Sequence, residues 1–471
     1  MTRTQAGAAP GWLRPAALGG GVLLILLTMT YYGGTARPGP LFALGVGVLA
    51  GTLLLFGLGV WWLLLSPLGA SAADRPALSA EARQSLAVLV ALSGLLFITG
   101  GLWDEVWHRL YGIGTAISDF WWRPHLMIYG SMGLMALFAL GGLMVAVRGG
   151  GGLRQRFRAE PRLGLLALTA AYLVLAAPSD ELWHRIYGLD ITAWSLPHIL
   201  FGVGVTLVML AGSALQVSVL PRPAGWRGLG GLRPGEGLLL ILLAVSLIAV
   251  MQIALTEWEV LRAAPSVDVE ADQFLRAFWR RPEWMYPAAL ITIAAFYGQV
   301  AVHSLRRAGA ATLLTAAVLG FRVVVLGLFA VTEAPTPLTL ASQVLVLAPA
   351  VALDLWYAAR LRQAETALTR VGGSLAGAAA FLLVSVPLLP QFLSYPRVNA
   401  VTLPGIVGMS LVLAVWGGWL GRAVGDWLQA QARPAGVQGA VPARVVWVGA
   451  GVLAAFAAFT FYFIATATPP V

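Results

Sequence analysis

Apolar residues occur along this chain in runs of about 20, which recur from near its start to its end with short polar connections between them. A helix of about 20 residues crosses the hydrocarbon core of a bilayer. Because the bilayer offers no water to the backbone, such runs must be helices that satisfy their own N–H and C=O groups. The pattern therefore predicts an all-α, polytopic transmembrane helix bundle. No long polar segment interrupts it, so we expect a single membrane domain over residues 1–471.

The pattern predicts about 13 spans. The first run is long enough to cross a bilayer, lacks a clear small-residue cleavage site and is followed by many more runs. We therefore interpret it as the first transmembrane helix and not as a cleaved secretory signal. The expected spans cover residues 16–34, 40–66, 84–104, 124–147, 162–179, 196–220, 236–257, 283–305, 310–332, 337–359, 371–390, 401–421 and 444–466.

Two copies of one acidic, aromatic and histidine-containing motif hold four of the five histidines. Residues 103–112 and 179–188 share the order Asp-Glu-x-Trp-His-Arg-x-Tyr-Gly, and Pro-His follows each copy, at 124–125 and at 197–198. Proline is favoured in a first helical turn, where a backbone N–H has no partner anyway. Each Pro-His is therefore expected to begin the helix that returns across the membrane.

The repeated motif predicts that the chain is built from tandem helix hairpins. The two complete copies define a metal-site hairpin pair over residues 84–220. A third, altered copy lies within residues 236–305, where Glu259 and Glu283 stand in place of the two histidines. Residues 310–466 form the remaining helical bundle.

Each motif places an aspartate four residues before a histidine, which puts carboxylate and imidazole on one helix face, one turn apart. The Pro-His of the returning helix supplies a second imidazole. Each hairpin is thus expected to hold one site with two histidines and one carboxylate. The predicted metal ligands are Asp104, His108 and His125 in the first copy, and Asp180, His184 and His198 in the second.

The ligand inventory limits which metal these sites would bind. The chain has no cysteine, which excludes disulfides, thiolate zinc sites, iron–sulfur clusters and cysteine nucleophiles. Two imidazoles and one carboxylate suit copper(II), non-haem iron(II) or zinc, and leave a coordination position open to water, dioxygen or substrate. Copper binds such sites most tightly, so we expect copper, with zinc or iron as alternatives.

Six further motif residues are expected to surround the metal ligands. The acids three residues before the histidines either accept a hydrogen bond from an imidazole or act as alternative ligands. The aromatic residues either line the sites or belong to the interfacial aromatic belt, and such residues also anchor helix ends where no metal is bound. The six are Glu105, Trp107, Tyr111, Glu181, Trp183 and Tyr187.

The second motif, with Asp190 and residues 197–199 after it, resembles the metal-binding region of the C subunit of particulate methane and ammonia monooxygenases. The resemblance implies that Asp180, His184 and His198 are copper ligands, and that partner subunits complete an oxidoreductase. It also implies a neighbouring site one hairpin away, although that family has an amide residue where the first motif here has aspartate. The resemblance covers only the third to sixth spans.

Charge placement predicts how the bundle lies in the membrane. Twenty of the thirty basic residues, all of them arginine, lie in the N-terminal segment and the even-numbered connections, which the positive-inside rule makes cytoplasmic. Most acidic residues lie in the odd-numbered connections with both motifs. We therefore expect a cytoplasmic N-terminus, an extracytoplasmic C-terminus and extracytoplasmic motifs. The net charge of +10 then indicates a lipid bilayer as partner and not a nucleic acid.

Several functions agree with these features. The leading hypothesis is a membrane metalloprotein that binds copper and activates dioxygen as a monooxygenase-like subunit. The alternatives are a copper or zinc handling or assembly protein, and a non-metal structural subunit of a membrane complex. Haem ligation ranks below the copper and the metal-handling hypotheses, because the four histidines lie at helix ends beside carboxylates.

A few polar residues outside the motifs also need an interpretation. His303, at the expected cytoplasmic end, has no carboxylate partner in the sequence pattern, and we interpret it as structural. Arg322 lies inside an apolar span, where charges are usually paired, and we expect Glu333 or Asp354 as its partner. A solvated acidic mouth or, as the alternative, a hard-oxygen metal site is expected from Glu257, Glu259 and Glu283.

Overall fold

The structure, a computed structural model, describes residues 13–32, 40–65, 78–111, 122–146, 157–158, 160–187, 193–228, 231–260, 281–332, 340–360, 367–393, 395–433 and 443–468. Nearly all of these residues are helical, and extended pairing among them is limited to two isolated bridges, Pro221 with Arg433 and Arg227 with Arg307. The predicted all-α fold is confirmed.

The helices follow the expected spans closely. They are α1 (Leu13–Tyr32), α2 (Pro40–Val60), η1 (Trp61–Leu65), α3 (Ala80–Tyr111), α4 (Arg123–Ala146), α6 (Pro161–Tyr187), α7 (Leu196–Val217), α8 (Pro234–Val260), α10 (Met285–Leu305), α11 (Ala310–Thr332), α12 (Ala341–Leu345), α13 (Leu347–Ala358), α14 (Ala367–Ala380), η4 (Phe381–Ser385), α15 (Val386–Phe392), α16 (Leu403–Ala430) and α17 (Ala443–Ala465). Within the described residues, twelve apolar helical stretches are long enough to cross a membrane, and α1 holds a shorter one.

The boundaries differ from prediction at the motifs and at the end of α16, which continues to Ala430 beyond the predicted end at 421. Helices α3 and α6 continue through the polar motif residues to Tyr111 and Tyr187, about two turns beyond the predicted span ends at 104 and 179. On α3, Trp103 and Trp107 pack against each other with ring centres 5.0 Å apart and are almost fully buried. Each motif is therefore part of its helix and not of the connection that follows.

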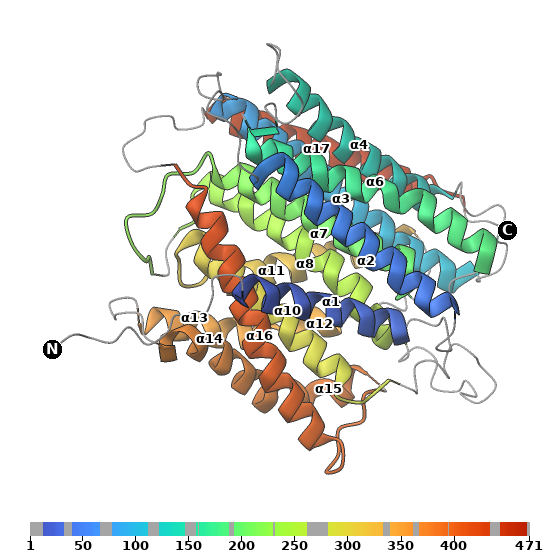
Figure 1. Ribbon diagram of the computed structural model, residues 1–471, viewed down its shortest axis with the longest axis vertical. Helices are drawn as coiled ribbons and strands as arrows, with labels where there is room; N and C mark the ends of the chain where they lie inside the picture. The colour runs from blue at the N-terminus through green and yellow to red at the C-terminus, as the bar shows by residue number, and fades with distance from the viewer. Residues whose placement is uncertain are drawn as a thin grey trace.

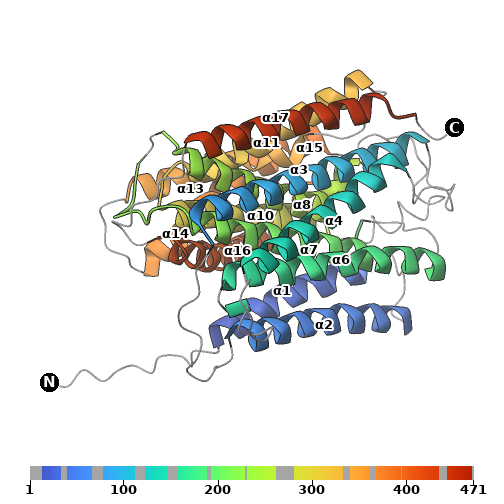
Figure 2. The same ribbon diagram turned by 90° about the horizontal axis from the view of Figure 1, so that it is seen from above.

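The helices run alongside one another in one bundle (Figures 1 and 2). Helices α3, α4, α6 and α7 pack together, α8 joins them to α10 and α11, and α16 packs along α10. Figure 2 shows α1 and α2 on one side of the bundle and α17 on the opposite side, where it contacts α3 and α11. A protein built this way is a multi-pass membrane protein.

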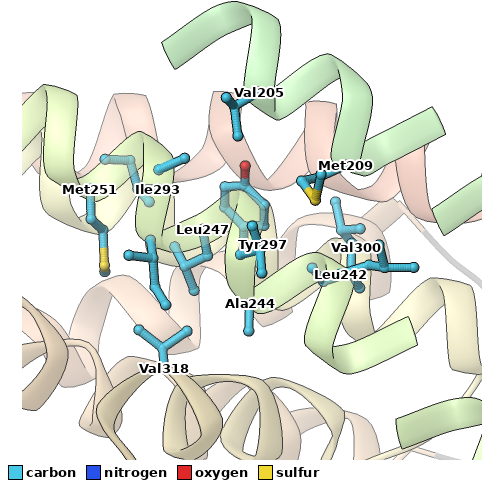
Figure 3. Close-up of a cluster of buried hydrophobic side chains, with 14 of the residues drawn as sticks. Val205, Met209, Leu242, Ala244, Leu247, Met251, Ile293, Tyr297, Val300 and Val318 are labelled. Atoms are coloured by element: carbon cyan, nitrogen blue, oxygen red, sulfur yellow. The ribbon is translucent and has the colours of Figure 1, made fainter. Parts of the chain in front are cut away.

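The centre of the bundle is an apolar cluster from α7, α8, α10 and α11 (Figure 3). Tyr297 lies among Met209, Leu242 and Leu247, with its hydroxyl directed toward α7 (Figure 3). That hydroxyl forms a 2.6 Å hydrogen bond with Ser246 Oγ. Helix association in lipid depends on close packing and interhelical hydrogen bonds, because lipid tails are as apolar as leucine. This cluster supplies both.

Helices α10 and α16 approach each other through glycine. Gly417, Gly421 and Gly425 follow one another at four-residue intervals on α16, so they share one face. A Cβ atom at Gly421 would collide with the carbonyl oxygen of Phe296 on α10. The absence of side chains on this face lets the two backbones touch, as small residues do at membrane helix interfaces.

Arginine side chains tie together the bundle end opposite the motifs. Arg83 Nη2 lies 2.9 Å from Glu160 Oε1, which joins the starts of α3 and α6. Arg227 Nη2 lies 2.6 Å from Glu236 Oε1 and so fixes the start of α8. The bundle therefore has one arginine-rich end and one end that carries the histidine motifs.

Candidate functional site

The second histidine of each motif lies in the first turn of a returning helix. Helix α4 begins at Arg123 and α7 at Leu196, so Pro124 and Pro197 lie in the first turns, as predicted. His125 and His198 follow these prolines directly. The first turn of α4 therefore places the His125 imidazole beside the end of α3. The first turn of α7 places that of His198 beside the end of α6.

The first motif forms a close carboxylate–imidazole pair. Asp104 Oδ1 on α3 lies 2.9 Å from His125 Nε2 on α4, and both side chains are largely buried. Trp122 stacks against the His125 ring with centres 6.3 Å apart, and Trp107 contacts Trp122 at 5.8 Å. Trp107 is thus part of the apolar surround of the His125 ring and not of an exposed aromatic belt.

The second motif repeats this arrangement with a wider gap. Asp180 Oδ1 on α6 lies 3.9 Å from His198 Nε2 on α7. Tyr129 donates a hydrogen bond of 3.0 Å to the other oxygen of the same carboxylate, Asp180 Oδ2. This bond leaves Oδ1 facing His198. The carboxylate is therefore oriented before any ligand binds.

Tyr129 connects the two motifs. It lies on α4 one turn after His125, and their ring centres are 5.9 Å apart. Phe201, one turn after His198 on α7, lies 6.5 Å from Tyr129 and 6.3 Å from His198. The two predicted sites are therefore neighbours joined by aromatic side chains. Neither Tyr129 nor Phe201 was predicted, and the available signal was their spacing from the histidines.

Several predicted residues lie outside the described side chains. They are His108, Tyr111, Glu181, His184 and Tyr187, together with the flanking Arg109 and Arg185. Trp183 is partly buried against the main core. Each predicted ligand set is therefore described in two of its three members. Among the described residues, no group of three or more His, Asp or Glu side chains is placed to hold a metal ion.

The described donors can be tested for their fit to a metal. Nitrogen and oxygen ligands of zinc lie about 2.0–2.2 Å from the ion, so two donors of one such ion are at most about 4.3 Å apart. The separations of 2.9 Å in the first pair and 3.9 Å in the second both meet this limit. The donor set of imidazole nitrogen and carboxylate oxygen also suits copper(II). Each described pair therefore has a separation compatible with two donors of one metal ion.

Trp194, just before α7, and Arg281, just before α10, support the second site. Trp194 Nε1 donates a 2.9 Å hydrogen bond to Ile253 O on α8. The Arg281 guanidinium lies 3.9 Å from the Trp194 ring centre and 5.0 Å from that of Trp258, and Arg281 is almost fully buried. Cation–π contacts of this kind gain strength when desolvated. They hold the start of α7, and so His198, against the third repeat.

The third repeat is arranged differently from the first two. Glu259 is buried, accepts a 3.2 Å hydrogen bond from Ser342 N, and has its Oε2 atom 3.6 Å from Arg322 Nη2. Glu283 accepts a 2.7 Å hydrogen bond from Arg397 N, and burial raises the pKa of its carboxyl. Glu259 therefore belongs to a buried ion pair and not to a solvated acidic mouth. The side chain of Glu257 lies outside the described part.

One of the two partners expected for Arg322, Asp354, is wrong. The carboxylate partner of Arg322 is Glu259, because α11 packs against the end of α8. Asp354 instead accepts hydrogen bonds from Thr312 N at 2.7 Å and from Ala311 N at 3.4 Å, and so caps the start of α11. Glu333 lies outside the described residues. Arg322 also interacts electrostatically with Glu105 of the first motif.

His303, at the other end of the bundle, is bonded on both ring nitrogens. Its Nδ1 lies 2.9 Å from Asp426 Oδ1, and its Nε2 lies 2.9 Å from Tyr357 Oη. The sequence pattern indicates no partner for His303, and α16 brings Asp426 to it, in agreement with a structural role. Its side chain is buried where α10, α13 and α16 meet.

No protein-family model matches this sequence, and comparisons with curated proteins and with solved structures give no match. Any functional assignment therefore rests on the residues and distances described above.

Proposed function

We propose that this chain is an integral membrane metalloprotein that binds copper at two neighbouring Asp/His/His sites and takes part in dioxygen activation as a monooxygenase-like subunit. The observation that carries the proposal is that the motif repeat brings an aspartate and a histidine together twice, from two pairs of helices. The separations of 2.9 and 3.9 Å both suit a shared metal ion.

The residues around the pairs have roles that suit such a centre. Tyr129 holds Asp180 by one carboxylate oxygen, and the other oxygen faces His198. Hydrogen bonds of this kind orient metal ligands and are costly to remove. Trp122 and Phe201 pack beside the two histidines and limit the orientations of their rings. Copper, when bound, supplies the one-electron chemistry that dioxygen activation requires.

The location of the sites suits an apolar substrate. Both pairs lie at helix ends within a bundle whose outer surface is apolar, so a lipid-soluble molecule can approach from the bilayer. By the positive-inside rule, the arginine-rich end is cytoplasmic and the motif end extracytoplasmic. The proposal thus places the sites outside the cytoplasm, where copper is the metal favoured by the affinity order.

A second candidate function is structural. The 2.9 Å contact between Asp104 and His125 is also the length of a charge-assisted hydrogen bond, which would fasten α3 to α4 with no metal present. In this case the motifs hold the hairpins together in a larger membrane complex. The two candidates differ in metal content, which can be measured directly.

The test is metal content by mass spectrometry on detergent-purified, copper-loaded full-length protein. We expect one copper ion per site in the wild type and a loss of both in a His125→Ala, His198→Ala double variant. The matched control is His303→Gln, which changes the fifth histidine at the far end of the bundle and should leave copper unchanged. Folded wild-type protein that retains no metal would refute the metal function and favour the structural one.

Copper retention would then be followed by oxygen uptake with apolar substrates. Uptake that requires both copper and the two histidines would support the monooxygenase-like role. Tight copper binding without any oxygen chemistry would instead identify a copper-handling protein.

A further inference from the structure

A chain of hydrogen-bonded side chains runs into the bundle from its arginine-rich end, where α10, α13, α14 and α16 meet. His303 lies within this chain, 2.9 Å from Asp426 Oδ1 and 2.9 Å from Tyr357 Oη. Tyr357 donates to Gln299 Oε1 at 2.8 Å, and Gln299 Nε2 donates to Ser374 Oγ at 3.2 Å. The Asp426 side chain is 45% exposed and the other four residues are buried, so the chain connects the surface with the interior.

The directions of these bonds determine which ring nitrogens of His303 carry a proton. Gln299 accepts through its oxygen and donates through its nitrogen, so the single hydroxyl proton of Tyr357 is used in the bond to Gln299. Tyr357 Oη therefore accepts from His303, and Nε2 carries a proton. An ionised carboxylate can only accept, so Nδ1 also carries a proton toward Asp426. A ring protonated on both nitrogens is the positively charged imidazolium.

The surroundings of Asp426 favour its ionised form. Its side chain is partly exposed to solvent, and Arg422 Nε lies 3.6 Å from its second oxygen, Oδ2. Exposure and a nearby opposite charge both favour an ionised carboxylate. The other charged and titratable groups around the pair are Arg306 at the end of α10, Tyr357 on α13 and, before α8, Arg227, which pairs with Glu236.

The His303 ring is held tightly in its position. Its side chain is 2% exposed, and the Trp226 ring lies edge-on to it with centres 5.4 Å apart. Trp226 also stacks on Tyr357, with centres 5.1 Å apart. On α16, a Cβ atom at Gly425 would lie 2.6 Å from His303 Cβ. The glycine thus lets α16 come close enough for Asp426 to reach the ring.

We propose that His303 is a buried proton-binding site, which joins α10 to α13 and α16 while it is protonated and loosens this junction when the pH rises. The imidazolium donates one hydrogen bond to Tyr357 and one to Asp426. When Nδ1 loses its proton, which passes to water at the exposed carboxylate, a nitrogen lone pair faces a carboxylate oxygen and the bond to α16 is lost. The junction lies at the opposite end of the bundle from the motifs and does not depend on the proposed copper function.

The test is solid-state ¹⁵N nuclear magnetic resonance of full-length protein in lipid bilayers, with both ring nitrogens of histidine labelled. At about pH 7.5 an unperturbed histidine is mostly neutral. We expect the His303 ring to have two protonated nitrogens at this pH. Its signals are assigned by their absence from His303→Gln and, independently, in a variant in which all four motif histidines are changed to glutamine.

Asp426→Asn is the matched variant. Its amide can donate to an unprotonated Nδ1, so the contact with His303 no longer requires a second ring proton. We expect His303 to be neutral in this variant at the same pH. It should stay doubly protonated in Glu81→Gln, which changes a more exposed carboxylate near Arg444 at the same end of the bundle.

Thermal unfolding tests whether the proton strengthens the junction. The wild type should lose stability relative to Asp426→Asn as the pH rises through the loss of the His303 proton. The reason is that the folded wild type favours the protonated ring, and the variant does not.

Three results would overturn the proposal. A wild-type His303 ring protonated at about pH 7.5 on Nδ1 alone would mean that Tyr357 donates to it, and one protonated on Nε2 alone would place the second proton on Asp426. A ring that stays doubly protonated in Asp426→Asn would show that the carboxylate does not hold the proton. Parallel changes of stability with pH in the wild type and Asp426→Asn would show that the proton does not strengthen the junction.

Discussion

Tyr129 donates a 3.0 Å hydrogen bond to Asp180 Oδ2, although the two residues belong to different motif hairpins. The bond runs from α4, which carries His125, to α6, which carries the aspartate of the second pair. It makes the two candidate sites a single unit in which α4 contributes to both. A change at Tyr129 should therefore affect the second site although it alters no predicted ligand.

We expect Tyr129→Phe to weaken copper binding at the second site by about 10- to 100-fold, because a group that orients a ligand is lost. The loss of one hydrogen bond should lower stability by only about 0.5–1.5 kcal/mol. Copper titration in a His125→Ala background, followed by electron paramagnetic resonance, isolates the second site. Tyr462→Phe, at an exposed position on α17, is the control. Equal copper affinities in the two variants would show that Tyr129 does not position Asp180.

The glycine face of α16 gives a prediction about stability alone. Gly421→Ala places a methyl group against the Phe296 carbonyl of α10 and should destabilise the bundle by about 1–3 kcal/mol through overpacking. Gly408→Ala on the same helix meets open space and should be neutral or stabilising, because alanine favours helix over glycine by up to about 1 kcal/mol. Unfolding by sodium dodecyl sulfate, followed by tryptophan fluorescence, measures both. Equal effects would mean that the α10–α16 contact does not require glycine at position 421.

The helices were predictable because the bilayer leaves the backbone few alternatives. Runs of apolar residues mark the spans whatever the packing, so helix existence and approximate limits follow from the sequence. The carboxylate–histidine pairing was also predictable, since the four-residue spacing and the returning Pro-His bring these groups to one end of a hairpin. The predicted pairs found in the structure are Asp104 with His125 and Asp180 with His198.

Contacts between hairpins were not predictable in the same way. The bond from Tyr129 to Asp180 depends on how α4 packs on α6, and the Arg322–Glu259 pair depends on how α11 packs on α8. Helices that are apolar on every side carry little information about which face turns toward which neighbour. Asp354, one of the partners expected for Arg322, instead caps α11, and helix packing brings Glu259 to Arg322.

Removing one member of the Arg322–Glu259 pair should destabilise the protein strongly, whereas replacing both members should cost much less. Arg322→Gln leaves a buried carboxylate without its guanidinium and should cost about 3–5 kcal/mol. The double variant Glu259→Gln, Arg322→Gln removes both charges and should recover much of that loss. Arg444→Gln is the control, because Arg444 and Glu81 form an exposed pair at 3.8 Å, worth at most about 1 kcal/mol. A double variant no more stable than Arg322→Gln would argue against direct coupling.

Glu283 gives a prediction about pH. Burial raises the pKa of its carboxyl above the ordinary value of 4.5, although the hydrogen bond from Arg397 N and the Arg397 charge oppose the rise. A raised pKa in the folded state means that folding favours the protonated carboxyl. The resulting contribution to stability is fully present below pH 4.5 and is lost as the pH rises through the raised value.

Glu283→Gln removes this titration but keeps a carbonyl oxygen that can accept from Arg397 N. The variant should therefore gain thermal stability relative to the wild type as the pH rises from the ordinary carboxyl pKa through the raised one, with the smallest difference in acid. Thermal unfolding measured across this range provides the comparison, with Glu81→Gln as a control at a more exposed glutamate near Arg444. If the wild type and Glu283→Gln differ by the same amount at every pH, Glu283 does not titrate differently in the folded state. If the stability advantage of Glu283→Gln over the wild type instead grows as the pH falls, folding favours the ionised carboxylate. The contact with Arg397 then outweighs the effect of burial.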